Sequence, residues 1–168
     1  MTSLATLVAA ATSGGAAAAI APIVTVPHVG LRTGSRWFAV PAEAVIEVVP
    51  LPDVTRLPAA PAHLLGVAMV RARLTAFVDL DVLIAGRRTP RLERGRAVVI
   101  RTGGVELGVI ATETRGLLGF PLAAAAPDPD AAPAERPPWI GREERIGGEL
   151  YAVVDPARLI EAALPGAA

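Results

Sequence analysis

Two histidines and a pair of aspartates are the side chains of this sequence with the most obvious chemical potential. Nucleophilic and acid-base catalysis need a base that titrates near neutral pH, and the sequence offers only His28 and His63. Neither stands at a telling distance from a serine or a carboxylate, and two histidines without a third ligand do not make a zinc site. The sequence therefore indicates neither an enzyme nor a metal centre, and we expect His63 to lie on the surface.

Asp79 and Asp81 are two positions apart in a strand-like run, so their carboxylates could share a face and hold a cation. The reading we favour is that Asp79 accepts backbone N–H groups and caps a turn, as short polar side chains at strand ends do. All sixteen basic residues are Arg, so a nucleotide-binding loop that requires Lys is excluded, and no G-x-G-x-x-G motif is present. No cofactor is expected.

A run of arginines after residue 86 could bind phosphate groups. Its members are Arg87, Arg88, Arg91, Arg94 and Arg96. No aromatic residue is interleaved, Pro90 and Gly95 interrupt the register, and sixteen acidic residues balance the sixteen basic ones. We therefore predict a solvated loop that joins two halves of the chain, and no binding of nucleic acid.

Composition favours a globular protein built from many short strands. The chain has 168 residues, of which 52% are hydrophobic and 4% aromatic, so any core is aliphatic. This length suits one compact domain or two small barrels that share an interface. Sixteen Gly and sixteen Pro break the chain into short pieces, and the absence of Cys excludes disulfides and thiolate chemistry.

The ends of the chain differ in composition from its middle. Residues 1–23 are uncharged and rich in Ala, without the basic start of a signal peptide, and small residues give little energy for insertion into a bilayer. We predict a flexible tail over 1–23, a domain over 24–164 whose two parts join around 81–96, a mobile Ala/Pro loop over 121–138, and a short tail over 165–168. Direct membrane insertion is not expected.

Turn residues between apolar runs predict a series of hairpins. One pairs 24–31 with 37–41, a second pairs 97–101 with 105–111 across Gly103-Gly104, and a third pairs 146–150 with 151–155 across Gly147-Gly148. Pro156 after Asp155 predicts the start of a short C-terminal helix. About ten short strands result, which is typical of two five-stranded barrels.

The stretch from Val54 to Leu80 carries the most information. Pro58 and Pro61 predict an extended, exposed segment over 56–62. Two alternating apolar runs follow and predict a hairpin that turns near Ala72 and Arg73, with Val67 and Met69 on one face of the first strand. Arg71 is then at a strand end, where its guanidinium can point toward a partner.

This stretch resembles the CheW-type chemotaxis coupling proteins. The resemblance rests on Pro58, Pro61, Gly66-Val67, Arg71 and Phe77-Val78-Asp79-Leu80, which follow the spacing of the family motif without a gap. Val45-Ile46-Glu47-Val48 and Gly108-Val109-Ile110 resemble two further elements. Three positions depart from the motif: Met69 stands at an Asn position, Ala72 at a Gly position and Ala76 at a Pro position.

The resemblance implies an all-β fold of two small SH3-like five-stranded barrels packed together, with a short C-terminal helix. It also implies a non-catalytic, cytoplasmic adaptor that couples the tip of a chemoreceptor to the regulatory domain of a CheA-type histidine kinase. The implied interface residues are Val45, Glu47, Gly66, Val67, Arg71 and Gly108.

Other readings of these residues remain open. Val45 and Val48 could be core residues with Glu47 solvated, and Arg71 could be a structural residue that holds the hairpin to a carboxylate such as Glu47. The three departures favour a paralogue that serves pilus motility or another kinase pathway. A ligand-binding or enzyme-accessory double barrel unrelated to signalling is the alternative from a different class.

Overall fold

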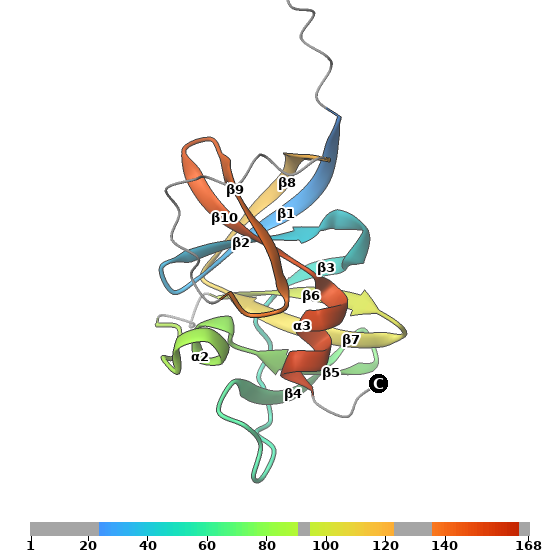
Figure 1. Cartoon of the computed structure of the whole chain (residues 1–168). Helices are drawn as coiled ribbons and strands as arrows, with labels where there is room; N and C mark the ends of the chain where they lie inside the picture. The colour runs from blue at the N-terminus through green and yellow to red at the C-terminus, as the bar shows by residue number, and fades with distance from the viewer. Residues whose placement is uncertain (1–23, 91–94, 123–135, 165–168) are drawn as a thin grey trace, which may run out of the picture.

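The computed structural model describes residues 24–90, 95–122 and 136–164, most of which lie in two five-stranded β-sheets (Figure 1). The predicted all-β fold of two small barrels with a short C-terminal helix is confirmed. The predicted tails over 1–23 and 165–168 lie outside the described residues, as do residues 123–135 of the predicted loop and Arg91 and Arg94 of the arginine run.

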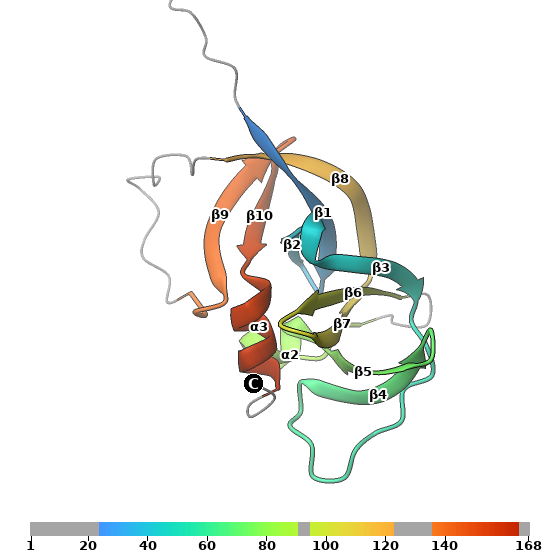
Figure 2. The ribbon, with the colours of Figure 1, turned by 90° about the vertical axis from the view of Figure 1, so that its right-hand side faces the viewer.

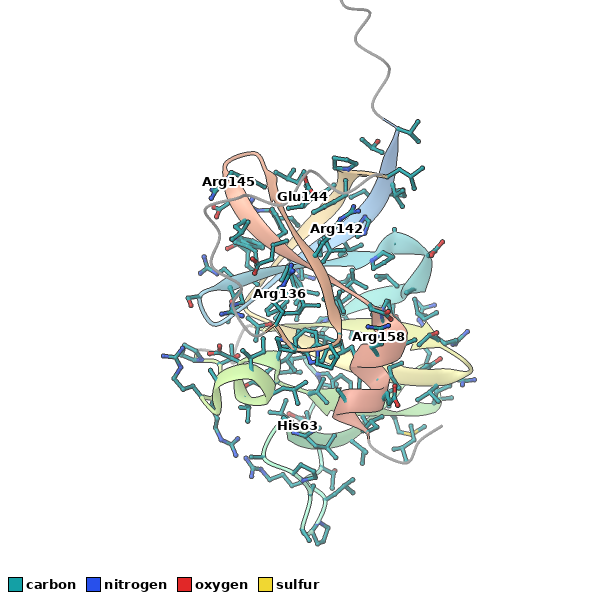
Figure 3. The ribbon with its side chains drawn as sticks, viewed as in Figure 1. His63, Arg136, Arg142, Glu144, Arg145 and Arg158 are labelled. Atoms are coloured by element: carbon teal, nitrogen blue, oxygen red, sulfur yellow. The ribbon has the colours of Figure 1, made fainter. Side chains whose placement is uncertain are left out.

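The first sheet, which we call barrel A, is built from both ends of the described chain, and Figure 2 shows its strands above those of the second sheet. Its strands run in the order β8-β1-β2-β10-β9, with β2 and β10 parallel. Arg142 on β9 donates from Nη2 to the Pro121 carbonyl on β8 at 2.6 Å, and this contact links the two edge strands (Figure 3). The strands are β1 (Thr25–Thr33), β2 (Arg36–Pro41), β8 (Glu113–Pro121), β9 (Ile140–Ile146) and β10 (Glu149–Val154).

The second sheet, barrel B, is continuous in sequence. Its strands run in the order β3-β6-β7-β5-β4, with β5 and β7 parallel. The strands are β3 (Val45–Pro50), β4 (Leu64–Val70), β5 (Arg73–Val78), β6 (Arg96–Thr102) and β7 (Val105–Ala111).

The predicted junction of the two parts around 81–96 is wrong. This segment joins β5 to β6, and both strands belong to barrel B. The chain passes between the barrels at 41–45 and at 111–113 instead, because β1 and β2 pair with strands from the C-terminal third. The prediction assumed that strands close in sequence share a barrel.

Each short helix has a local cause in the sequence. Asp155 caps α3 (Pro156–Ala163) by accepting from the backbone N–H groups of Ala157 and Arg158, as predicted, and Pro156 occupies the first turn. Asp79 caps α2 (Leu80–Ala85), which ends at Gly86 in the left-handed conformation. A single 3-10 turn, η1 (Ala42–Ala44), leads from β2 into β3.

Three clusters of buried side chains form the core. The largest lies between the barrels and joins residues of both sheets to α3, including Phe38 and Val40 from barrel A, Ile100 and Leu107 from barrel B, and Leu159. Each barrel also has an interior cluster of its own, around Phe77 in barrel B and around Trp37 and Tyr151 in barrel A. The two barrels are therefore fused through one apolar layer.

Two details of the central stretch differ from the prediction. The segment over 56–62 is exposed as expected, but it is not extended throughout, because Pro58 and Ala59 form a turn in which Ala59 has φ 56°. The β4–β5 hairpin turns at Arg71 and Ala72, one residue earlier than predicted, since Val70 pairs with Arg73.

Among the helices of the described residues, none has the length and apolarity needed to cross a bilayer.

Candidate functional site

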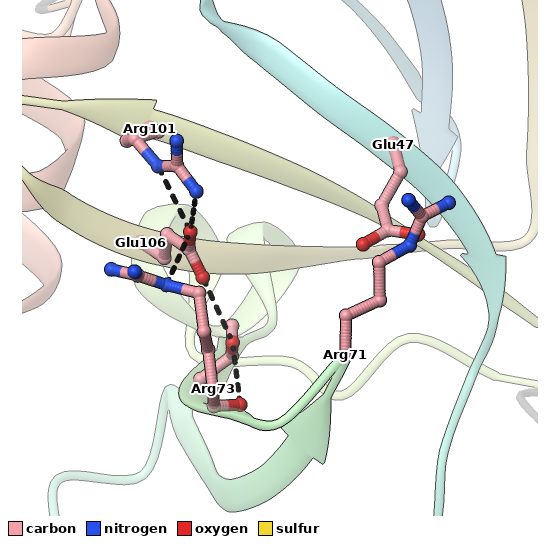
Figure 4. A network of polar contacts seen from close by, with 6 residues as sticks. Glu47, Arg71, Arg73, Arg101 and Glu106 are labelled. Carbon is pink, nitrogen blue, oxygen red and sulfur yellow. Dashed lines mark hydrogen bonds and ion pairs between the residues drawn. The ribbon is translucent and has the colours of Figure 1, made fainter.

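Arg71 and Glu47 form an ion pair at one end of barrel B (Figure 4). Arg71 is the first residue of the β4–β5 turn, and its Nε lies 2.9 Å from Oε2 of Glu47 on β3. A bulge in β3 at Ile46 sets the position of Glu47, because Val45 pairs with Ile100 while Glu47 pairs with the next residue back, Val99. The side chain of Glu47 is 12% exposed and that of Arg71 is 79% exposed.

This ion pair joins the two edges of the barrel B sheet. β3 and β4 are at opposite ends of its strand order, so no sheet pairing connects them directly. Thr55, just after β3, exchanges two backbone hydrogen bonds with Val67 on β4, at 2.8 and 2.9 Å, and the Arg71–Glu47 contact adds a side-chain link. The structure therefore has the contact between Arg71 and Glu47 that the structural reading of Arg71 requires, while the side chain of Arg71 stays 79% exposed.

The alternative in which Val45 and Val48 are core residues and Glu47 is solvated is wrong in part. Val45 is half-buried and packs against the shared apolar layer. Val48 is 37% exposed, and Glu47 is largely covered by its position beside Arg71. Burial alternates along β3, so Val45 and Glu47 share the covered face, whereas Val48, three residues from Val45, lies on the exposed face.

The two glycines among the predicted interface residues are buried packing positions. Gly66 has φ 144°, and a Cβ there would lie 2.1 Å from the carbonyl oxygen of Thr55, so only glycine lets the two backbones pair. A Cβ at Gly108 would lie 2.5 Å from ring carbons of Phe77, which is fully buried. Of the predicted set, the structure brings together Glu47 and Arg71 and leaves Val67 half-buried at the surface, while Gly108 lies inside.

A second charged cluster next to the hairpin was not predicted. Glu106 on β7 accepts hydrogen bonds from Arg101, and its Oε1 lies 2.8 Å from Nε of Arg73 (Figure 4). The hydroxyl of Thr75 lies 3.5 Å from Oε2 of Glu106. The Arg101 hydrogen bond, aided by the charges of Arg73 and Arg101, holds the pKa of Glu106 below its ordinary value, although burial acts in the opposite direction. The side chain of Glu106 is 6% exposed, so the exposed charge of this cluster is basic.

The structure also has an open groove, lined by both apolar and charged side chains, that sequence reasoning missed. It has a volume of about 440 Å³ and lies between the β4–β5 hairpin, the β6–β7 hairpin and the end of α3. Its lining consists of Val67, Arg73, Leu74, Ala76, Gly104, Val105, Glu106 and Leu164. Alternation along β4 predicts that Val67 and Met69 share a face, but it does not indicate that residues 104–106 and 164 lie beside Val67.

The residues considered for catalysis have structural contacts. His28 is buried against Phe120, with ring centroids 4.6 Å apart. His63 is only partly exposed, and its Nε2 lies 3.0 Å from the carbonyl oxygen of Ala163 at the end of α3, so the prediction of a surface residue holds only in part. Asp79 accepts from the backbone N–H of Asp81 and from both the N–H and hydroxyl of Thr89, which confirms the predicted turn cap. No group of three or more His, Asp or Glu side chains suited to a metal ion occurs within 24–90, 95–122 and 136–164.

Comparison with known proteins agrees with this architecture. The model of the CheW-like domain matches residues 27–164. The chain is 34% identical to Protein PilI of Pseudomonas aeruginosa over 94 residues, which are 56% of this chain and 53% of that protein, so the match spans about half of that relative. It is 29% identical to Protein FrzA of Myxococcus xanthus over 118 residues, 70% of this chain and 74% of that protein.

The fold is also similar to that of a solved structure. The crystal structure of the scaffolding protein TtCheW from Thermoanaerobacter tengcongensis superposes with a TM-score of 0.66 and 15% sequence identity, covering 78% of this chain and 89% of that one. At this identity the likeness establishes the two-barrel fold, while the match of the domain model over 27–164 establishes descent. The chain therefore belongs to the family of CheW-like domains.

Proposed function

We propose that this chain is a non-catalytic adaptor that couples a chemoreceptor to a CheA-type histidine kinase at a cytoplasmic receptor array. The observation that carries the proposal is the exposed guanidinium of Arg71, which a tight hairpin and Glu47 hold in place within a CheW-like domain. Such an arrangement offers a directed charge on a rigid scaffold, which suits recognition by a partner protein.

Within this proposal, Glu47, Arg71 and Val67 are contact residues, and Val45 borders them from β3. Gly66 and Gly108 act indirectly, because they allow the backbone and Phe77 to pack beneath the contact surface. Replacing either glycine would weaken binding by distorting barrel B and not by removing a contact.

A divergent paralogue of a pilus-motility or other kinase pathway is the second candidate. Two observations favour it: both relatives matched in sequence carry names other than CheW, and Met69, Ala72 and Ala76 depart from the family motif. Binding of purified chain to the kinase regulatory domain and to receptor tips encoded in the same genome separates the candidates. If the chain binds neither fragment, an accessory double barrel outside signalling is the better reading.

A charge swap tests the role of Arg71. Arg71→Glu should abolish binding of the receptor tip. The thermal midpoint should change by only a few degrees, because the side chain of Arg71 is 79% exposed and solvent screens much of its attraction to Glu47. The double variant Glu47→Arg with Arg71→Glu restores the ion pair in reverse. We expect it to recover the thermal midpoint but not the binding, as measured by calorimetric titration.

Recovery of binding in the charge-swapped variant would contradict the contact role, because the ion pair alone would then explain the loss. Collapse of folding in Arg71→Glu would likewise show that its role is structural.

A further inference from the structure

Strand β9 has an edge with which no other described strand pairs. It is the last strand of the barrel A sheet and pairs only with β10, while β8 ends the sheet on the other side (Figure 2). In barrel B the two edges are joined by backbone hydrogen bonds between Thr55 and Val67, but within the described ranges no backbone hydrogen bond joins β8 to β9. The N–H and C=O groups along one side of β9 can therefore pair with another strand.

The inner face of β9 carries two charged side chains with unused hydrogen-bonding capacity. The side chain of Glu144 is 9% exposed and that of Arg142 is 24% exposed. Nε of Arg142 lies 3.9 Å from Oε2 of Glu144, which is too far for a hydrogen bond, and neither atom has another hydrogen-bond partner among the described residues. Buried polar atoms of native proteins almost always have a partner, so β9 has one donor and one acceptor that remain to be satisfied.

A second copy of β9 supplies the complementary charges in one register. Directly opposite residues of a sheet share a face, so two identical antiparallel strands related by a two-fold axis pair about a single residue, which lies opposite its own copy. With Glu143 at that position, Arg142 of each copy lies opposite Glu144 of the other on the inner face. Side chains placed in this way have Cβ atoms about 4.5–5.5 Å apart, within reach of an ion pair. With Arg142 or Glu144 at the centre, like charges would face each other instead.

The outer face of β9 is compatible with the same register. Its exposed residues are Gly141, Glu143 and Arg145. Arg145 of each copy would lie opposite Gly141 of the other and diagonal to Glu143 of the other, and diagonal neighbours are within reach of long side chains. The two facing Glu143 carboxylates are thus flanked by guanidinium groups. An unrelated apolar strand would leave the inward charges of Arg142 and Glu144 unpaired, which selects against it.

We propose that β9 pairs with β9 of a second copy of this chain, antiparallel and centred on Glu143, so that the barrel A sheets of two copies join into one. The pairing satisfies the buried donor and acceptor of each copy with the acceptor and donor of the other. A single pair of short edges makes a small interface, so we expect a dissociation constant of about 10–100 µM. The proposal needs neither receptor nor kinase, and it goes beyond the proposed function because a dimer carries two Arg71 side chains.

A disulfide test measures the register directly. The chain has no Cys, so Glu143→Cys introduces a single thiol on the exposed face of β9. At the centre of the pair its two copies would have Cα atoms about 4.5–5.5 Å apart, which suits a disulfide. Arg145→Cys is the matched control, because its two copies would be about 14 Å apart. After oxidation with copper phenanthroline, a non-reducing gel should show a cross-linked dimer of Glu143→Cys and at least about tenfold less of Arg145→Cys. Equal cross-linking of the two variants, or none of Glu143→Cys, would overturn the proposed register.

An exchange of charges tests the inner ion pairs. In sedimentation equilibrium between about 5 and 500 µM, the wild type should rise from the monomer mass of 17.2 kDa toward twice that mass. Arg142→Glu and Glu144→Arg should each remain monomeric alone, because like charges face each other. An equimolar mixture of the two variants should dimerise, since every inner pair then joins opposite charges. A mixture that stays monomeric, or single variants that dimerise as well as the wild type, would contradict the proposal.

Exposed variants keep the test decisive if circular dichroism shows that an inner-face variant does not fold. Glu143→Arg leaves only arginines at the centre of the outer face and should weaken dimerisation at least about tenfold. Glu43→Arg makes the same change of charge at an exposed position on η1 and should leave it unchanged. A wild type that is monomeric at every concentration overturns the inference but not the proposed function, because coupling through Arg71 needs only one copy.

Discussion

The residues of the β4–β5 turn adopt a conformation that their types disfavour. Arg71 and Ala72 have φ 46° and 62°, both in the left-handed region. The β6–β7 and β9–β10 hairpins place Gly-Gly at the same two positions, Gly103-Gly104 and Gly147-Gly148, which tolerate positive φ without a steric penalty. A side chain in this region costs on the order of 1 kcal/mol per residue. The turn therefore retains Arg71 at a cost in stability, which supports a role for its guanidinium.

Ala72→Gly should stabilise the protein. Glycine relieves the contact of the Ala72 Cβ with its own backbone, and we expect the free energy of unfolding to rise by about 1 kcal/mol, or the thermal midpoint by roughly 2–4 °C. Denaturant unfolding followed by circular dichroism measures this change. The matched control is Ala62→Gly, at an exposed position outside the positive-φ set, which should lower stability slightly. A destabilising effect of Ala72→Gly would show that the turn is not strained.

At the residue scale, the sequence predicted which residues form the Arg71–Glu47 contact better than it predicted how deeply individual residues are buried. The contact between Arg71 and Glu47 was expected as one of two roles, because both residues fit the family motif and have opposite charge. The burial of Gly108 could not be read from the sequence, since the space beside it is filled by Phe77 from another strand. The exposure of Leu74 could not be predicted either. Alternation along a strand separates its two faces, but it does not show whether other elements cover one face or both.

At the element scale, hairpins and helices followed from local signals. The Gly-Gly pairs and the Asp155-Pro156 start of α3 specify their turns and cap within a few residues, and the structure has them where expected. The segment over 56–62 was less well predicted. Proline fixes only its own φ, so Pro58 and Pro61 do not determine the conformation of Ala59, which lies in a turn with φ 56°. The charged end of the β6–β7 hairpin was missed, since it joins Glu106 to Arg73 of the neighbouring hairpin.

The pKa of Glu106 gives this hairpin a specific pH dependence. A carboxylate whose pKa is lowered by folding contributes stability above its unfolded pKa and loses that contribution as the pH falls toward the folded value. Glu106→Gln removes the contribution, so the variant should be less stable than wild type at about pH 7 and closer to it at about pH 3. Urea unfolding at the two pH values measures the difference. Glu43→Gln, which replaces an exposed glutamate on η1, should follow the wild type at both, and a Glu106→Gln deficit that persists unchanged in acid would contradict the assignment.

At the scale of the whole molecule, the fold depends on pairings between distant segments. β2 pairs with β10 and β5 pairs with β7, both in parallel, and the first of these pairings joins residues more than 100 positions apart. The family resemblance predicted two barrels, but local patterns could not assign strands to them. The hydrophobic pattern of a strand does not specify which other strand it pairs with. The two crossings between the barrels, and the apolar layer that the barrels share, could therefore not be predicted from local patterns.

The shared layer predicts that both barrels unfold together. Ile110 is fully buried inside barrel B, whereas Trp37 lies inside barrel A and Trp139 in the shared layer. Ile110→Ala should cost about 2–5 kcal/mol and lower the thermal midpoint by roughly 5–15 °C. Because the layer couples the sheets, tryptophan fluorescence and far-ultraviolet circular dichroism should shift by the same amount. Ile46→Val on the exposed edge is the control and should change stability by less than about 0.5 kcal/mol. A fluorescence transition that stays at the wild-type midpoint while the dichroism splits into two steps would show that barrel A folds independently, and the apolar layer would then be an interface between two domains instead of one common core.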